Sequence, residues 1–193
     1  VKAISLGEFL NFNIDKSYDA SSRDQVTAVL VKTTPKLYFY IEKNWWEVQL
    51  QAKQDEVLRN FDSLSAEFEN RIYPILTSVY GSEWNPGVDG ESRITLLFHF
   101  MREDVGGYFR TADEYIRIQA PDSNEREMLY LPLAQSDNSK LKSFLAHEFV
   151  HLITFNQKDR IFNVSEEVWL NEGRAEYSNT ILGYDDPYSG SNL

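Results

Sequence analysis

The chain has 193 residues, 42% of them hydrophobic, and carries a formal net charge of -11 at pH 7. The acidic excess argues against nucleic acid or an anionic membrane surface as a partner. Because the chain has no cysteine, disulfide bonds and thiol catalysis are excluded.

The length suits one large domain with a substantial core. No apolar run in the sequence approaches the roughly 20 residues that cross a bilayer, so we expect no membrane insertion. The N-terminal segment VKAISLGEFLNF has neither a basic start nor a long apolar stretch, which is not the pattern of a signal peptide. Since the chain does not begin with methionine, an earlier leader that was removed is compatible with the sequence.

The N-terminal quarter of the chain is predicted to form strands. Residues 1–24 are mixed and polar, which predicts an arm or a first strand followed by a loop. Two alternating runs within 25–43 flank a turn at 34–36 and predict a β-hairpin. We expect Trp45 and Trp46 to continue the second run and to pack in or beside the core; a ligand-stacking platform is the alternative.

Residues 55–80 show the longest helical pattern, with apolar side chains at i, i+3 and i+4. Pro74 is expected to bend or divide this helix near 72–73, and Gly81 is a suitable stop. We expect the helix to pack under a sheet as a backing helix. Residues 83–91 are rich in turn formers and predict a loop.

Three further runs predict strands. Residues 93–101 form a continuous apolar run, which predicts a central strand; His99 within it is expected to be a core residue and not a metal ligand. Residues 115–119 alternate as a short strand, and 128–133 form another that Pro132 should keep near an edge. Between the runs at 93–101 and 115–119, a pair of glycines at 106–107 predicts a bulge or turn, with a mobile lip over a cleft as the alternative.

The stretch 144–155, FLAHEFVHLITF, carries the strongest functional signal. His147 and His151 are four residues apart, so a helix places both imidazoles on one face, where they can hold one zinc ion. Glu148 lies about 100° further round the helix, beside such a metal. This position suits a general base that acts on zinc-bound water.

A catalytic zinc site needs a third protein ligand. The metzincin pattern requires glycine at 154 and histidine at 157, but the chain has Thr154 and Gln157. The better candidate is Glu172 in WLNEGRAEY, because the 20 residues after His151 allow a loop and an antiparallel helix. We expect that helix to run from about residue 165 to residue 183.

One turn beyond the third candidate ligand, Glu176 should face the same side of its helix. Its carboxylate is placed to accept a hydrogen bond from the distal N–H of a ligand histidine, most suitably His147. We therefore expect Glu176 to orient the ligand without binding the metal itself.

The motif HEFVH followed by WLNEGRAEY resembles the gluzincin class of zinc metallopeptidases. Together with DVGGYFRTADEY and NEREMLYL, these segments resemble the M30, hyicolysin-like family of bacterial neutral proteases over roughly residues 80–183. The resemblance implies Zn²⁺ bound by His147, His151 and Glu172, with Glu148 as the catalytic carboxylate. Glu176 occupies the position of the supporting acid, where thermolysin has aspartate.

The fold that this resemblance implies is α+β and zincin-like, with a mixed twisted sheet, a backing helix and an HExxH active-site helix. The expected division is into N-terminal strands or an arm packed on the sheet at 1–50, a catalytic domain at 51–183, and a tail at 184–193 with a minimal or missing lower subdomain. A protein of this family is expected to be secreted or displayed on a bacterial cell surface.

One departure concerns the oxyanion donor. Gluzincins usually place a tyrosine or histidine for this role well after the third ligand, but only 21 residues follow Glu172 here. Tyr108, Tyr177, Tyr184 and Tyr188 are the available candidates, and the sequence does not choose among them.

The sequence thus predicts a zinc metalloendopeptidase that hydrolyses peptide bonds with a zinc-activated water, with Glu148 as general base. Its expected partner is a peptide or protein substrate that pairs with an edge strand, either 128–133 or 106–110. The alternative is a non-catalytic zinc-binding or protein-interaction domain derived from a peptidase. An aminopeptidase is disfavoured, because no GxMEN-type segment precedes the motif.

Overall fold

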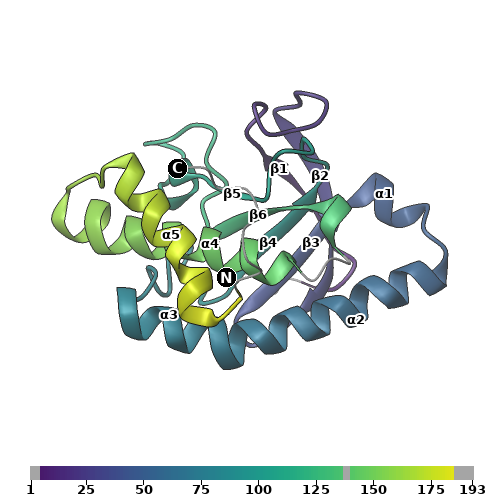
Figure 1. Cartoon of the computed structure of the whole chain (residues 1–193). Helices are drawn as coiled ribbons and strands as arrows, with labels where there is room; N and C mark the ends of the chain where they lie inside the picture. The colour runs from purple at the N-terminus through teal and green to yellow at the C-terminus, as the bar shows by residue number, and fades with distance from the viewer. Residues whose placement is uncertain (1–4, 137–139, 185–193) are drawn as a thin grey trace.

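A six-stranded sheet forms the centre of the molecule (Figure 1). The computed structural model describes residues 5–136 and 140–184. The strands follow the order β1-β2-β3-β4-β6-β5 across the sheet. They are β1 (Phe9–Asn13), β2 (Gln25–Thr33), β3 (Leu37–Glu42), β4 (Ile94–His99), β5 (Tyr108–Phe109) and β6 (Met128–Pro132).

The sheet is mixed, as predicted. Strands β1, β2 and β3 are antiparallel neighbours, whereas β3, β4 and β6 run parallel to one another. Strand β5 closes the far edge antiparallel to β6. The predicted hairpin is confirmed as β2 and β3, the predicted central strand as β4, and the expected first strand as β1. Of the two candidate edge strands, the short β5 lies at the edge and β6 lies one position inside it.

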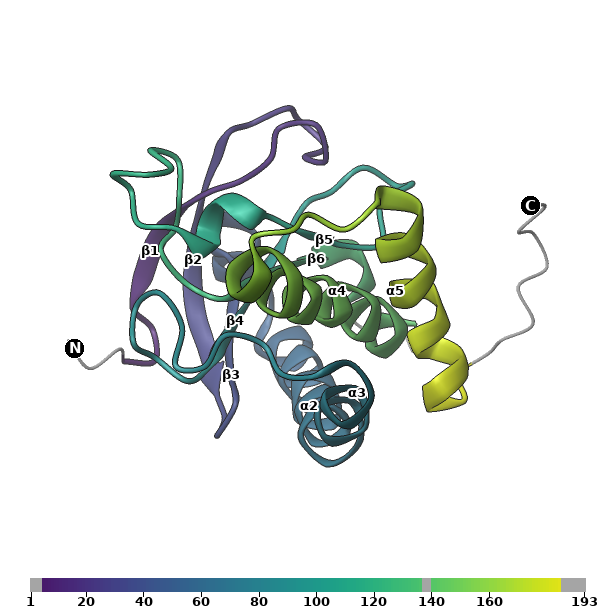
Figure 2. The same ribbon diagram turned by 90° about the vertical axis from the view of Figure 1, so that its left-hand side faces the viewer.

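The helices lie mainly on one side of this sheet (Figure 2). Helices α2 and α3 form a long rod along the sheet, α4 packs beside them, and α5 lies on the outer side of α4. None of the helices in the described ranges is both long and apolar enough to cross a membrane. The α-helices are α1 (Lys43–Glu47), α2 (Gln51–Glu67), α3 (Tyr73–Tyr80), α4 (Leu141–Thr154) and α5 (Val168–Leu182).

The long backing helix is divided where proline predicts. A π-helical segment, Phe68–Ile72, joins α2 to α3, and Pro74, which has no N–H to donate, follows in the first turn of α3. Gly81 ends the helix with a φ of +90°. In the same way α5 ends at Gly183, which adopts the left-handed conformation with a φ of +63°.

Two predictions in strand regions are wrong. Trp45 and Trp46 lie in the short helix α1 and not in an extension of β3, although they pack against the core as expected. Residues 115–119 form bends and turns after a 3₁₀ turn at Thr111–Glu114. Local hydrogen bonds, from the Arg117 amide to Glu125 and from Ser123 Oγ to the Tyr115 carbonyl, hold this segment in turns, which leaves Ile118 92% exposed.

The sheet separates two apolar clusters. Alternate residues of β4 face opposite sides, so Leu96 and Phe98 contact the helices while Leu97 joins the cluster on the other face. On the helix side, Phe61 of α2 stacks on Phe39 at 4.8 Å and lies 4.6 Å from Phe98, between ring centroids. This aromatic group fixes the backing helix to the centre of the sheet.

We predict that Phe61→Ala lowers the free energy of unfolding by about 3–5 kcal/mol, because it removes a fully buried ring from this group. Urea unfolding followed by circular dichroism measures the change. The matched control is Ile118→Ala at the 92% exposed position, which should change stability by less than about 0.5 kcal/mol. Equal losses in the two variants would contradict the assigned core.

Candidate metal centre

Helix α4 carries the HExxH sequence and is buried on most of its circumference. Its apolar residues pack against the sheet and the backing helix, which leaves one stripe to face α5. The fully buried members of α4 are Leu145, Ala146, Phe149, Val150, Leu152 and Ile153. Because each turn of a helix takes 3.6 residues, His147 and His151 both fall on the remaining stripe.

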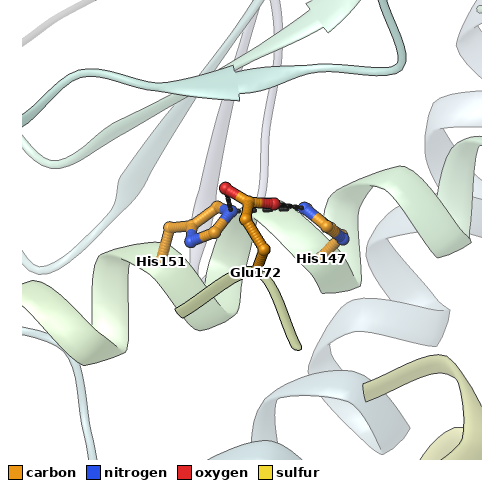
Figure 3. Close-up of side chains that lie close together, drawn as sticks. All are labelled: His147, His151 and Glu172. Carbon is orange, nitrogen blue, oxygen red and sulfur yellow. Dashed lines mark hydrogen bonds and ion pairs between the residues drawn. The ribbon is translucent and has the colours of Figure 1, made fainter. Parts of the chain in front are cut away.

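Helix α5 packs on α4 and crosses it obliquely (Figures 1 and 2), and its residues meet those of α4 in reverse order along the chain. His147 lies within ion-pair distance of both Glu172 and Glu176. Of these two glutamates, His151 is near Glu172. Figure 3 shows the Glu172 carboxylate placed over the two imidazole rings. The antiparallel return that the loop length predicts therefore brings together His147, His151 and Glu172.

Four donor atoms of three residues lie close together here. The Nε2 atoms of His147 and His151 are 3.2 Å apart. Oε2 of Glu172 lies 3.4 Å from Nε2 of His147, and Oε1 of Glu172 lies 3.6 Å from Nε2 of His151. Among the residues with described placement, this is the only group of three or more histidines and acids whose ligand atoms lie within 4.8 Å of one another.

The donor set fits a tetrahedral zinc ion. Bonds of about 2.0–2.1 Å to nitrogen and oxygen require edges of about 3.3–3.4 Å between neighbouring ligand atoms. The Nε2–Nε2 distance of 3.2 Å is close to this length, and each Glu172 oxygen lies at a similar distance, 3.4 or 3.6 Å, from one of the two imidazoles.

The electrostatics of the centre favour neutral imidazoles. Burial and, to a smaller extent, the neighbouring His151 together lower the pKa of His147 to about 4, although Glu172 acts in the opposite direction. Neutral imidazole is the form that binds metal. The Glu176 carboxylate lies 3.6 Å from Nδ1 of His147, on the side of the ring away from Glu172. Glu176 thus faces the distal nitrogen, which is the position expected for it.

The Glu148 side chain is only 6% exposed, although it belongs to a polar motif. Burial raises the pKa of Glu148 to about 8, and the nearby Glu172 carboxylate adds to this shift. A dication held by Glu172 would act in the opposite direction and lower this pKa. The carboxyl group therefore lies where a proton can be taken up and released near neutral pH.

The paired glycines before β5 pack directly on α4. A Cβ atom at Gly106 would lie 2.7 Å from the ring of Phe144, and one at Gly107 would lie 2.9 Å from Cγ of Glu148. Sequence reasoning offered a turn or a mobile lip and missed this contact. The signal was the glycine pair itself, because missing side chains also permit close approach of two elements.

Of the tyrosines named as oxyanion donors, Tyr108 and Tyr184 are hydrogen-bonded to other groups. The Tyr108 hydroxyl lies 3.1 Å from His99, in the cluster on the opposite face of the sheet. Tyr184 donates a 2.5 Å hydrogen bond to a glutamate of α2. Tyr177 is 58% exposed on α5, and Tyr188 lies outside the described residues, as does all of the predicted tail beyond Tyr184.

His99 is a core residue, as expected. It is fully buried in β4, with Nδ1 lying 3.3 Å from Asp19 and Nε2 lying 3.1 Å from the Tyr108 hydroxyl. These contacts tie the N-terminal loop to β4 and β5 and leave the imidazole on the face of the sheet away from α4.

The chain is similar to a metallopeptidase. That relative is the neutral metalloprotease ShpI of Staphylococcus hyicus, which is 29% identical over 132 residues. The aligned residues make up 58% of this chain but only 28% of ShpI, so the chain spans less than a third of the relative's length. No protein-family model matches the chain.

We predict that the wild-type chain binds one zinc ion and that Glu172→Ala and His147→Ala weaken binding most. Glu176→Gln should weaken it by about 10–100-fold, because it alters the partner of a ligand and not a ligand. Competition with a chromogenic chelator measures the affinities. The exposed Glu167, at the start of α5, supplies the control Glu167→Gln. Wild-type affinity in all variants would contradict the assignment.

We predict that Gly107→Ala destabilises the protein by about 1–3 kcal/mol, because its methyl group overlaps Glu148 and lies 3.0 Å from the Tyr130 carbonyl oxygen. The control is Gly173→Ala in α5, where a Cβ meets no atom within 4 Å and the helix should gain about 0.5–1 kcal/mol. Thermal unfolding distinguishes the two. A Gly107→Ala variant as stable as the wild type would show that β5 does not pack as described.

Proposed function

We propose that this chain is the catalytic part of a zinc-dependent endopeptidase of the gluzincin kind, with a zincin-like fold. The observation that carries the proposal is the convergence of His147, His151 and Glu172, whose ligand atoms all lie within 4.8 Å of one another and which are the residue types that bind catalytic zinc. The similarity to ShpI, a protein named as a neutral metalloprotease, supports the same reading independently.

Bound zinc would supply Lewis acidity, which lowers the pKa of water and polarises a peptide carbonyl. Glu148 takes the proton from the attacking water and delivers it to the leaving amine nitrogen, so that the carboxyl group ends the cycle as it began. His147 and His151 would hold the ion, and Glu176 would keep the His147 imidazole oriented through its distal nitrogen.

The substrate is an extended peptide or protein segment. Strand β5 lies at the edge of the sheet, and the glycine before it contacts Glu148. A peptide that pairs with β5 by main-chain hydrogen bonds therefore passes over the carboxylate that accepts the proton. Because Gly106 and Gly107 have no side chains, the backbone before β5 can lie close to Glu148 and Phe144 of α4.

A second candidate function is non-catalytic zinc binding, and one observation favours it. Of the candidate oxyanion donors that the structure describes, the Tyr108 hydroxyl is hydrogen-bonded with His99 and the Tyr184 hydroxyl with Glu67. The third, Tyr177, is exposed on α5 and has no assigned role. A chain that holds zinc without an oxyanion donor would turn over substrate slowly. Zinc binding without cleavage of any unfolded protein would select this function.

We predict that Glu148→Gln lowers the rate of casein or peptide cleavage by about 10²–10⁴-fold, the usual contribution of a general base. Zinc content and melting temperature should stay close to wild type, because the amide occupies the same volume and is not a ligand. Glu103→Gln, at an exposed glutamate outside the centre, is the control for charge. If wild type and Glu148→Gln cleave at the same rate, the mechanism is wrong.

A further inference from the structure

Exposed apolar side chains gather in the segment that leads into α5. Large apolar residues that are exposed singly are common on protein surfaces, but a cluster of them marks a binding surface. Between residues 161 and 169, the large apolar residues with at least half of their surface exposed are Ile161, Phe162, Val164, Val168 and Trp169.

Two members of this cluster lie beside the metal centre. Val168 and Trp169 precede Glu172 by four and three residues, so helical spacing places them on the same side of α5, one turn before the carboxylate. Because α5 meets α4 in reverse order, this turn continues past His151 toward the end of α4. The two residues are 76% and 72% exposed, so they are free to contact a bound molecule there.

An aromatic residue from another part of the chain lies at the same end of α4. Phe155 follows His151 by four residues, and its amide donates to the His151 carbonyl, so its ring lies one turn further along the same side of the helix. The Tyr115 ring packs edge-on against Phe155, with 5.7 Å between the ring centroids. Since Tyr115 is still 37% exposed, apolar groups from two different segments border the His151 end of the centre.

The direction of β5 decides which part of a substrate meets these residues. Just before the strand, a Cβ atom on Gly106 would lie 2.7 Å from the ring of Phe144, near the start of α4. Within the strand, the ring centroid of Phe109 lies 6.2 Å from that of Phe155, at the end of α4. Strand β5 therefore runs along α4 in the same direction as the helix. A peptide that pairs with β5 antiparallel, which is the commoner and more stable arrangement, places the residues before the cleaved bond at the His151 end.

We propose that Tyr115, Val168 and Trp169 form a subsite for a large apolar side chain on the N-terminal side of the cleaved bond. This inference rests on the proposed function and adds its substrate class, which is peptides with an aromatic or aliphatic residue just before the bond. Contact between such a side chain and the three residues removes apolar surface of both from water. At the His147 end of the centre, α5 presents the exposed Glu176 in the corresponding position, so the apolar preference is confined to one side.

The test uses hydroxamates, which bind zinc through the group that replaces the cleaved bond and therefore need no turnover. In an acetyl-amino-acid hydroxamate the side chain precedes the zinc-binding group, whereas in a benzylsuccinyl hydroxamate it follows that group. Zinc-loaded wild type should bind acetyl-phenylalanine hydroxamate at least about 10-fold more tightly than the serine analogue, because the phenyl group loses its contact with water. Isothermal titration calorimetry measures the dissociation constants.

The variants assign this preference to particular residues. Trp169→Ala and Tyr115→Ala should each lose most of the preference for phenylalanine over serine and keep the zinc affinity of wild type, because neither residue is a ligand. The matched control is Val48→Ala, at a residue 75% exposed at the end of α1, which should keep the full preference. If Tyr115→Ala does not fold, the exposed Trp169 still decides the question.

Three results would overturn the subsite and leave the zinc site in place. Wild type could bind the phenylalanine and serine hydroxamates equally, or the preference could survive in Trp169→Ala. The third is that only the benzylsuccinyl probe depends on Trp169, which would place the apolar side chain after the cleaved bond. A wild-type chain that binds no zinc would overturn the proposed function and this inference together, so the two failures are distinguishable.

Discussion

The antiparallel packing of α4 on α5 is the constraint on which the rest of the centre depends. Helix α4 contributes two imidazoles one turn apart, and α5 returns so that Glu172 meets both of them. Helix α4 alone supplies two of the three candidate metal ligands, and the third comes from α5. The sheet and the backing helix serve this pairing, because they bury α4 on its other sides and leave a single stripe exposed to α5.

The centre is costly to the fold when it holds no cation. Burial depresses the pKa of His147 to about 4 and raises that of Glu148 to about 8, which shows that the charged forms of both groups are disfavoured by the surroundings. Apolar side chains at these positions would pack with less penalty. Groups of this kind are concentrated where a ligand or a reaction requires them.

Much of this could be predicted from the sequence. The spacing of His147, Glu148 and His151 follows from the helical repeat, and Pro74 and the hairpin turn act locally, so these predictions held. Residues 115–119 were misassigned because local hydrogen bonds, from Ser123 Oγ to the Tyr115 carbonyl and from the Arg117 amide to Glu125, hold them in turns, which a pattern of apolar residues does not reveal. The burial of Glu114 and Glu127, which are 1% and 2% exposed, could not be foreseen either, since isolated glutamates in a polar segment have the pattern of surface residues.

The most direct test of the account is anomalous X-ray scattering at the zinc absorption edge from crystals of the purified protein. The account predicts one strong peak within bonding distance of Nε2 of His147, Nε2 of His151 and a carboxylate oxygen of Glu172. An electron-density map in which the Glu172 side chain turns away from both imidazoles, with no peak between the two helices, would contradict it.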